Sequence, residues 1–277
     1  MKIAVWNIRG IGSSSKKRII RSLIREEGID IIGLVESKHN EVTLHDMNRC
    51  WGNQDVEWLQ VPAGEGGSGG MILSWIKDIF ILEEHKTTQY WILALGILQQ
   101  NNFRCNICTV YAPNDQTGRL DVWNQLREMK ANSPDPWILM GDFNEVLCPQ
   151  ERRGASTTTP GMREMAHFIQ DLQMIDMDIN LKFTWMRRNA ASRIDRILVG
   201  AEFMDSFPRL QAYCKDRLLS DHYPILLAFN AVSWGPQPFR SLDCWLKEPS
   251  FLQVFKKEWL QLTRIPLDQK LKKLKHH

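Results

Sequence analysis

Side chains that bind metal ions or transfer protons recur directly after apolar runs of the chain. They are Asn7, Glu36, Asp142 with Asn144, Asp195, and Asp221 with His222. Carboxylate and amide oxygens are ligands for hard divalent cations, and carboxylates and histidine are the commonest groups for moving protons. Each motif alone is a weak signal, but the combined pattern departs from chance and indicates a site of metal-binding or acid-base chemistry.

An ordinary structural explanation exists for several of these residues. Glu36 follows the apolar run IIGLV and can be an exposed acid at a strand end. Asp142 and Asn144, in the segment GDFN, can form a turn because Gly, Asp and Asn favour turns. Asp195 is harder to explain this way, because it lies in the middle of an expected strand, where an inward-pointing acid needs a partner.

The elements that must position these side chains begin with a strand, a helix and a second strand. Residues 1–8 and 29–35 read as buried strands, because apolar side chains dominate both faces. Between them, residues 16–27 place four apolar side chains on one helical face, and Gly28 is a helix stop signal. A polar residue, Asn7 or Glu36, therefore stands at each strand exit.

The rest of the chain alternates further strands with helices. Strands are expected at residues 56–62, 71–75, 80–85, 91–98, 103–111, 137–141, 183–186, 193–199 and 223–229, and helices at 119–131 and 161–172. The glycine-rich run 64–70 is expected to be a turn, because no helix with a Lys-Ser/Thr pair follows it as in a phosphate-binding loop. This order, without internal repeats, indicates a mixed α/β or α+β architecture.

The character of the chain changes after residue 229. We expect one domain over residues 1–230, a linker-like segment over 231–249 and a basic amphipathic helical tail over 250–277. Charge divides in a similar way: residues 1–239 hold 26 basic and 28 acidic side chains, whereas residues 240–277 hold 9 and 4. A near-neutral body does not by itself identify a nucleic-acid-binding protein, so such a function must rest on local arrangement.

Composition excludes several classes of protein. With 43% hydrophobic and 24% charged residues, the chain is neither disordered, collagen-like nor a coiled coil. Six cysteines are too few for a disulfide scaffold, and Cys105 and Cys108 lie on an expected strand, facing opposite sides rather than one zinc ion. The longest apolar run, residues 90–98, is shorter than the roughly 20 residues that cross a bilayer. We expect an intracellular protein, nuclear or cytoplasmic, that is neither secreted nor in a membrane.

Six motifs, in this order, resemble the endonuclease/exonuclease/phosphatase superfamily of divalent-metal phosphodiesterases. They lie at residues 5–7, at Glu36, and at residues 110–113, 141–144, 193–195 and 220–222. Within the superfamily the chain looks most like the endonuclease domain of LINE-type (non-LTR) retrotransposon polyproteins, especially plant ones, because of residues 67–75, 183–185 and 239–245. The resemblance implies a four-layer α/β/β/α sandwich of two packed β-sheets flanked by helices, with a C-terminal helical extension.

The resemblance also implies a metal site. Glu36 would be the principal ligand, with Asn7 beside it and Asp221 assisting. Mg²⁺ would be the cofactor, with Mn²⁺ as an alternative, because Mg²⁺ keeps several waters and needs only one or two protein carboxylates.

The same resemblance assigns the catalytic groups. Asp142 would hold or deprotonate the attacking water, and Asn144 would orient that water and the phosphate. His222, fixed by a hydrogen bond to Asp195, would contact the scissile phosphate as a charged imidazole. Tyr111 would stabilise the phosphate or the leaving oxygen.

DNA is the expected partner, and its contacts are expected around one arginine-rich hairpin. The candidates are Thr184, Arg187, Arg188, Arg193 and Arg196, together with Arg152 and Arg153. Such a stretch can equally be a solvated hairpin without a ligand. Phosphate contacts would make binding sensitive to salt, whereas sequence choice would depend on base contacts or DNA deformability. We expect a monomer that does not bind membranes.

Three functions fit these observations. The first is a Mg²⁺-dependent endonuclease that nicks one DNA strand and leaves a 3′-hydroxyl. The second is another phosphoesterase of the superfamily: an abasic-site nuclease, a deadenylase or a phosphatase of small molecules or lipids. The third is an idle retroelement remnant that only binds nucleic acid, against which the intact motifs weigh. A reverse transcriptase domain does not fit in residues 230–277, so the tail reads as the stub of a missing continuation.

Overall fold

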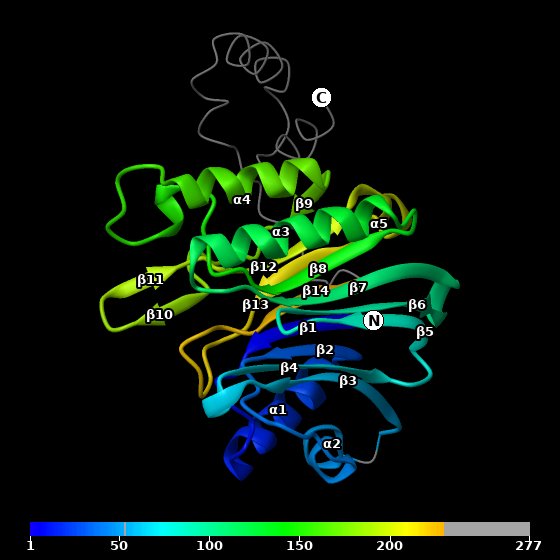
Figure 1. The fold of residues 1–277 in the computed structure, drawn as a ribbon. Helices are drawn as coiled ribbons and strands as arrows, with labels where there is room; N and C mark the ends of the chain where they lie inside the picture. Colours follow the sequence, from blue (N-terminus) through cyan, green and yellow to red (C-terminus); the bar gives the residue numbers. More distant parts are fainter. Residues whose placement is uncertain (53, 230–277) are drawn as a thin grey trace, which may run out of the picture. The chain divides into compact units, whose positions relative to one another are not determined.

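Two six-stranded β-sheets pack face to face between two pairs of helices (Figure 1). The computed structural model describes residues 1–52 and 54–229. The predicted linker-like segment 231–249 and helical tail 250–277 lie outside the described residues. The expected α/β/β/α sandwich is confirmed for the part of the chain that the structure describes.

The first sheet has the strand order β13-β14-β1-β2-β4-β3. Its strands are β1 (Lys2–Asn7), β2 (Ile31–Val35), β3 (Val56–Ala63), β4 (Gly69–Ile76), β13 (Gln211–Cys214) and β14 (Ile225–Ala228). β1 runs parallel to β2 and antiparallel to β14. The carboxyl ends of β1 and β2 and the amino end of β14 therefore share one edge of the sheet.

The second sheet has the order β5-β6-β7-β8-β12-β9. Its strands are β5 (Phe80–Thr87), β6 (Trp91–Leu98), β7 (Phe103–Tyr111), β8 (Trp137–Asp142), β9 (Met174–Asp176) and β12 (Asp195–Gly200). β8 is parallel to β7 and antiparallel to β12, so the end of β7, the end of β8 and the start of β12 lie together. A separate hairpin is formed by β10 (Trp185–Arg187) and β11 (Ala190–Ser192).

Helices cover the outer face of each sheet. The first sheet carries α1 (Ser14–Glu27) and α2 (Leu44–Trp51), and the second carries α3 (Gln116–Ala131) and α4 (Pro160–Asp171); α5 (Ala201–Ser206) follows β12. Short 3-10 turns occupy Glu65–Gly67, Gln99–Asn101 and Pro149–Glu151. None of the described helices is long and apolar enough to cross a membrane.

Alternation along the strands builds the layers. In β1, Val5 packs between the sheets, whereas Trp6 faces the helical layer formed by α1 and α2. Cys105 and Cys108 on β7 likewise belong to opposite layers, with Cys105 between the sheets and Cys108 under α3 and α4. Both thiols are buried, and burial raises the pKa of each well above its usual range, which fits a packing role.

α1 begins two residues before its expected start and ends at the expected stop, Gly28. The Ser13 side chain accepts a hydrogen bond from the Lys16 amide at the start of α1. Gly28 ends the helix with a positive φ of 64°, a conformation that costs glycine little. The turn at Gly28 returns the chain into β2, which places Glu36 beside the end of β1.

Several elements have no counterpart among the sequence expectations. α2, α5, β9, β11 and β13 are all eight residues or shorter, so each carries too few residues for a periodic pattern to show. α2 did leave one local signal: Thr43 and Asp46 form a capping box at its start. Asp195 is the first residue of β12 rather than the middle of a strand, which corrects its expected position.

Candidate active site

Six strand ends meet at one edge of the sandwich, and their exits carry the polar side chains singled out in the sequence. Within the second sheet, Asp142 on β8 is paired with Tyr111 on β7 and with Asp195 on β12. Within the first sheet, Asn7 is paired with Val35, so Glu36 follows directly beside Asn7. A side-chain hydrogen bond from Asn7 to Asp142 connects the two sheets at this edge.

Asn7 lies between two carboxylates. Its Nδ2 donates to Asp142 Oδ2 at 2.9 Å and to Glu36 Oε1 at 3.4 Å, while its Oδ1 accepts a hydrogen bond from the Arg9 amide at 3.3 Å. The Tyr111 hydroxyl donates to the same Glu36 oxygen at 2.9 Å. Burial and the neighbouring Glu36 raise the pKa of Tyr111, so this phenol stays protonated and serves as a donor. The two acids are thereby held in fixed orientations.

Asp142 is buried beside a second acid. Burial, followed by the negative charge of Asp195, raises the pKa of Asp142 to about 7. Its Oδ1 accepts from the Asn144 amide at 3.0 Å, and Asn144 Nδ2 donates to the Ala112 carbonyl at 2.7 Å. Asn144 adopts a positive φ of 50°, a left-handed conformation that asparagine takes more readily than most residues, and these two hydrogen bonds hold the turn.

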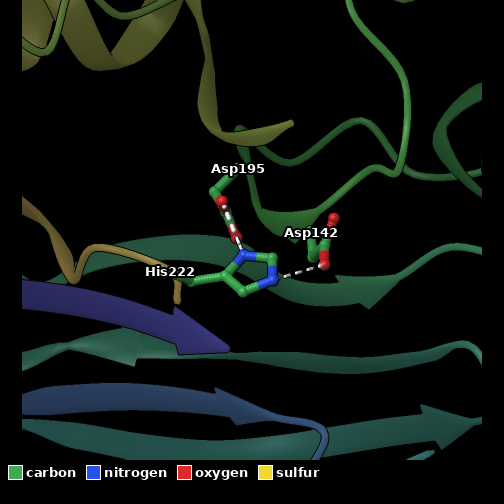
Figure 2. Close-up of side chains that lie close together, drawn as sticks. All are labelled: Asp142, Asp195 and His222. Atoms are coloured by element: carbon green, nitrogen blue, oxygen red, sulfur yellow. Dashed lines mark hydrogen bonds and ion pairs between the residues drawn. The ribbon is translucent and has the colours of Figure 1, made fainter. Parts of the chain in front are cut away.

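His222 and Asp195 form a buried pair (Figure 2). The His222 Nδ1–H donates to the Asp195 carboxylate, at 3.0 Å from Oδ1 and 2.9 Å from Oδ2, and Nε2 lies 3.9 Å from Asp142 Oδ2. Burial alone would lower the pKa of His222, but Asp195 outweighs burial and raises it to about 9. The ring is therefore an imidazolium at neutral pH, and the expected hydrogen-bonded partner of Asp195 is present.

The loop that carries His222 is fixed by contacts with β1 of the first sheet and with the β10–β11 hairpin. Trp6 Nε1 donates to the His222 carbonyl at 3.1 Å, and Ser220 Oγ donates to the Asn7 carbonyl at 2.7 Å. Trp185 Nε1 on the hairpin donates to Asp221 Oδ2 at 3.0 Å. The aspartate and histidine of the Ser-Asp-His motif therefore both lie at the site, as the sequence suggested for adjacent residues on a bent loop.

Arg9 is a site residue that the sequence reasoning missed. Its guanidinium forms an ion pair through Nε with Asp221 Oδ1, and its Nη1 lies 3.7 Å from Glu36 Oε2. Lys38 Nζ also lies 3.6 Å from Glu36 Oε2 but is more exposed. The one available signal was the position of Arg9 two residues after Asn7, at the same strand exit.

The donor set around Glu36 fits a hard divalent cation. It offers the Glu36 and Asp221 carboxylates and the Asn7 amide oxygen, which keeps a lone pair besides the one used by the Arg9 amide. Asp221 Oδ1 is buried, and Arg9 Nε lies against it as an ion pair. A partly buried carboxylate that needs a positive charge beside it fits a cation ligand.

Asp142, Asp195 and His222 form a second compact group whose ligand atoms lie within 4.8 Å of one another. His222 is a poor ligand in this arrangement. Its Nδ1 is used by Asp195, and the raised pKa of its imidazole keeps the ring protonated, whereas metal binding needs a neutral ring. We therefore favour the oxygen ligands around Glu36.

Not every expected DNA contact faces the solvent. Thr184 is fully buried, and its hydroxyl accepts hydrogen bonds from the Ile194 and Asp195 amides at 3.1 and 2.9 Å. Because backbone amides occupy that oxygen, Thr184 positions Asp195. The prediction that Thr184 contacts DNA is therefore wrong.

The expected arginines divide into two groups. Arg187 and Arg188 are exposed on the hairpin. Arg193 instead pairs with Glu151 at 3.2 Å and Asp176 at 3.1 Å, and the fully buried Arg196 pairs with the same two acids. The Arg193 and Arg196 guanidinium groups therefore hold the start of β12 in place. The prediction that these two arginines contact DNA is wrong.

These residues surround an open groove of about 450 Å³. Its lining combines polar site residues and two further arginines with small side chains of the β10–β11 hairpin, one isoleucine and one indole ring. The lining includes Arg9, Glu36, Asn114, Asp142, Asn144, Arg152, Arg153, Trp185, Ala190, Ala191, Ser192, Ile194 and His222.

A buried ion-pair network supports the basic wall of the groove. Glu145 is 4% exposed and accepts hydrogen bonds from Arg119 Nη2 at 2.9 Å and from Arg152 Nη2 at 3.2 Å. Arg119 is itself 8% exposed and also donates to the Asn114 carbonyl at 2.6 Å. Glu145 thus links Arg152 to the loop that follows β7.

Replacing Glu145 with alanine should lower the free energy of unfolding by about 3–5 kcal/mol, because Arg119 would be left buried without a carboxylate. Urea denaturation at pH 7 measures this change. The matched control is Glu128→Ala on the exposed face of α3, where a change within about 0.5 kcal/mol is expected. A loss below about 1 kcal/mol for Glu145→Ala would show that the network contributes little.

Fold and site together define a class of protein: a two-sheet sandwich with an acidic and histidine-containing site at the strand exits, typical of phosphoester hydrolases. The sequence profile described as "Endonuclease/Exonuclease/phosphatase family" matches residues 4–222. The chain belongs to this family. Membership of this family and the sequence relative described next point to a hydrolase that acts on phosphodiester bonds, and the solved structures share its fold.

Individual relatives agree with this assignment. An exodeoxyribonuclease of Bacillus subtilis (strain 168) is 26% identical over 266 residues, covering 83% of this chain and all of the relative. An AP endonuclease from Archaeoglobus fulgidus has a similar fold, with a TM-score of 0.65 and 17% identity over 83% of this chain and all of that one. The endonuclease domain of TRAS1, a telomere-specific non-LTR retrotransposon, also has a similar fold. Its TM-score is 0.63 and its sequence identity 11%, over 82% of this chain and 96% of that one. The resemblance to plant elements in particular stays a prediction.

Proposed function

We propose that this protein is a divalent-metal-dependent DNA endonuclease that nicks one strand and leaves a 3′-hydroxyl. One observation carries the proposal: Asp142 lies between the Asn7–Glu36 pair and the His222–Asp195 pair at the floor of an open groove. Groups for cation binding, water activation and phosphate recognition are thus next to one another. The nuclease relatives among both the sequence and the structure matches support DNA as the substrate.

Glu36 would hold the metal, with Asn7 and Asp221 as further oxygen ligands. When bound, Mg²⁺ or Mn²⁺ supplies positive charge that offsets the charge developing on the phosphoryl oxygens. Tyr111 and Asn7 hold the Glu36 carboxylate in place through hydrogen bonds, so the ligand is oriented before the cation arrives.

Asp142 would activate the attacking water. Burial and Asp195 raise its pKa to about 7, so the ionised carboxylate is a stronger base than an ordinary aspartate. The Asn7 and Asn144 hydrogen bonds fix both oxygens of Asp142, and either oxygen retains a lone pair for a water proton. Attack of this water on phosphorus breaks the P–O3′ bond while Asp142 takes the water proton. The leaving O3′ takes a proton from solvent in the open groove and becomes the 3′-hydroxyl, and the phosphate remains as a 5′-phosphate on the other strand end.

His222 would bind the scissile phosphate. Asp195 holds the ring through Nδ1 and keeps it charged, so Nε2–H faces the groove as a cationic donor. A cationic donor matches the added negative charge of the pentacoordinate phosphorus better than the ground-state phosphate. His222 is therefore placed to act mainly in the transition state.

Surface arginines would bind the DNA backbone on either side of the site; Arg153, Arg187 and Arg188 are exposed, and Arg152 is half-buried with one guanidinium nitrogen on Glu145. Arg152 and Arg153 lie along the groove, and Arg187 and Arg188 project from the β10–β11 hairpin. Contacts of this kind position a duplex without reading its sequence, and their number sets the salt dependence of binding. Arg193 and Thr184 are left out of this contact set because both are engaged within the protein.

The proposal is tested by incubating supercoiled plasmid with the purified full-length chain and Mg²⁺, with and without chelator. We expect conversion to the open-circular form that chelator abolishes, and nicks that a DNA polymerase extends without prior end treatment because they carry a 3′-hydroxyl. Parallel assays use abasic duplex, poly(A) and inositol phosphates. Faster turnover of any of these would assign the site to another phosphoesterase, and DNA binding without cleavage would indicate an idle remnant.

A further inference from the structure

The Arg9 side chain is placed between two acids of the proposed metal site. Nε contacts Asp221 Oδ1 and Nη1 lies 3.7 Å from Glu36 Oε2, so one guanidinium bridges carboxylates from separate loops. The Arg9 side chain is 35% exposed, whereas those of Glu36 and Asp221 are 10% and 18% exposed. The two acids are therefore partly desolvated, and Arg9 compensates their charge.

The backbone around Arg9 is tightly held. Its carbonyl accepts a hydrogen bond from Lys16 Nζ at 2.6 Å, and its amide donates to Asn7 Oδ1 at 3.3 Å. The next residue, Gly10, donates to the Glu36 carbonyl at 2.6 Å. Arg9 also has a positive φ of 50°, a strained conformation that persists only because these contacts impose it. The direction of the side chain is thus built into the loop.

We propose that Arg9 is a positioning residue that competes with the divalent metal ion for Glu36 and Asp221 and so sets the metal affinity of the site. This inference rests on the proposed metal site. A guanidinium and a hard dication both need the same carboxylate oxygens, and Glu36 Oε1 is already occupied by Tyr111 and Asn7. A metal ion must therefore displace Arg9 from Glu36 Oε2 and Asp221 Oδ1 or share these oxygens with it.

Charge supports this role. Burial would lower the pKa of Arg9, but Glu36 and Asp221 raise it above its usual value, so the side chain stays a cation under all ordinary conditions. Without Arg9, two nearby carboxylates would repel each other, which favours uptake of a dication. Removing the arginine should therefore tighten metal binding while destabilising the protein in chelator.

The decisive measurement is the dissociation constant of Mn²⁺, titrated calorimetrically into the full-length wild type and into Arg9→Gln. We expect Arg9→Gln to bind Mn²⁺ about tenfold or more tightly, since a unit positive charge a few ångströms from the ligands is removed. The matched control is Lys38→Gln, which removes a cation 3.6 Å from Glu36 alone, at a more exposed position. A change below about threefold is expected there.

The melting temperature, measured with chelator and with Mn²⁺, distinguishes a change in metal affinity from misfolding of the variant. In chelator, Arg9→Gln should melt at a lower temperature than the wild type, and saturating Mn²⁺ should raise its melting temperature by more than it raises that of the wild type. Unchanged or weaker Mn²⁺ binding by folded Arg9→Gln would overturn the competition. Glu36→Gln in the wild-type background separates the two proposals: if it leaves Mn²⁺ binding intact, the proposed metal site is wrong, and the role of Arg9 falls with it.

Discussion

Asp142→Asn should lower the rate of plasmid nicking about 10²–10⁴-fold, the range expected when a general base is removed. Asparagine keeps the Oδ1 that accepts the Asn144 amide, but a neutral amide oxygen is too weak a base to take a proton from water. The rate is measured at saturating Mg²⁺ and at saturating DNA, so that a loss of binding does not mimic a loss of chemistry.

The fold should survive this substitution. Burial already disfavours the charged form of Asp142, which is why its pKa is raised to about 7, so a neutral amide removes a desolvated charge. We expect the free energy of unfolding to change by no more than about 1 kcal/mol, because the new amide group faces the Asn7 Nδ2 donor and offsets part of that gain. Asp121→Asn, at an exposed position of α3, is the matched control. Nicking within about threefold of wild type by folded Asp142→Asn would exclude Asp142 as the base.

The sequence was sufficient to predict the strand exits. β1, β2, β7 and β8 are apolar runs bounded by polar residues, and each was predicted to within two residues of its observed limits. The polar residues at the ends of these runs were expected to form one site because metal-binding and proton-transferring types recur there, and Asn7, Glu36 and Asp142 do lie in hydrogen-bond contact. The structure adds the reason: β1 and β2 are parallel neighbours, as are β7 and β8, so their carboxyl ends share an edge. Local periodicity was enough to locate the strand ends.

Contacts between segments far apart in the chain were beyond sequence reasoning. Arg9 meets Asp221 across 212 positions of the chain, a pairing that no local pattern encodes. Thr184 could have been a DNA contact by residue type, but its hydroxyl is used by the amides of Ile194 and Asp195. The burial of Arg196 against Glu151 and Asp176 likewise depends on how β12, β9 and a 3-10 turn come together. Tertiary packing decides whether a polar side chain faces substrate or structure.

His222 and Asp195 should behave as one functional unit. His222→Ala is expected to lower nicking about 10²–10⁴-fold, and Asp195→Ala nearly as much, because the ring then loses its orientation and its charge. The double variant should be no slower than His222→Ala alone, since removing the ring leaves Asp195 without a role. A double variant whose loss equals the product of both single losses would show that the two residues act independently.

Asp195→Asn distinguishes orientation from charge. The asparagine oxygen can still accept the Nδ1–H hydrogen bond, but the negative charge that raises the His222 pKa to about 9 is gone, and burial alone lowers that pKa. The imidazolium of this variant is therefore lost at a lower pH than in the wild type, so its nicking should be slow at pH 8 and partly recover as the pH falls. NMR titration of the His222 ring measures the pKa directly. If Asp195→Asn instead nicks as fast as the wild type at pH 8, Asp195 serves only to orient the ring, and the cationic role of His222 is wrong.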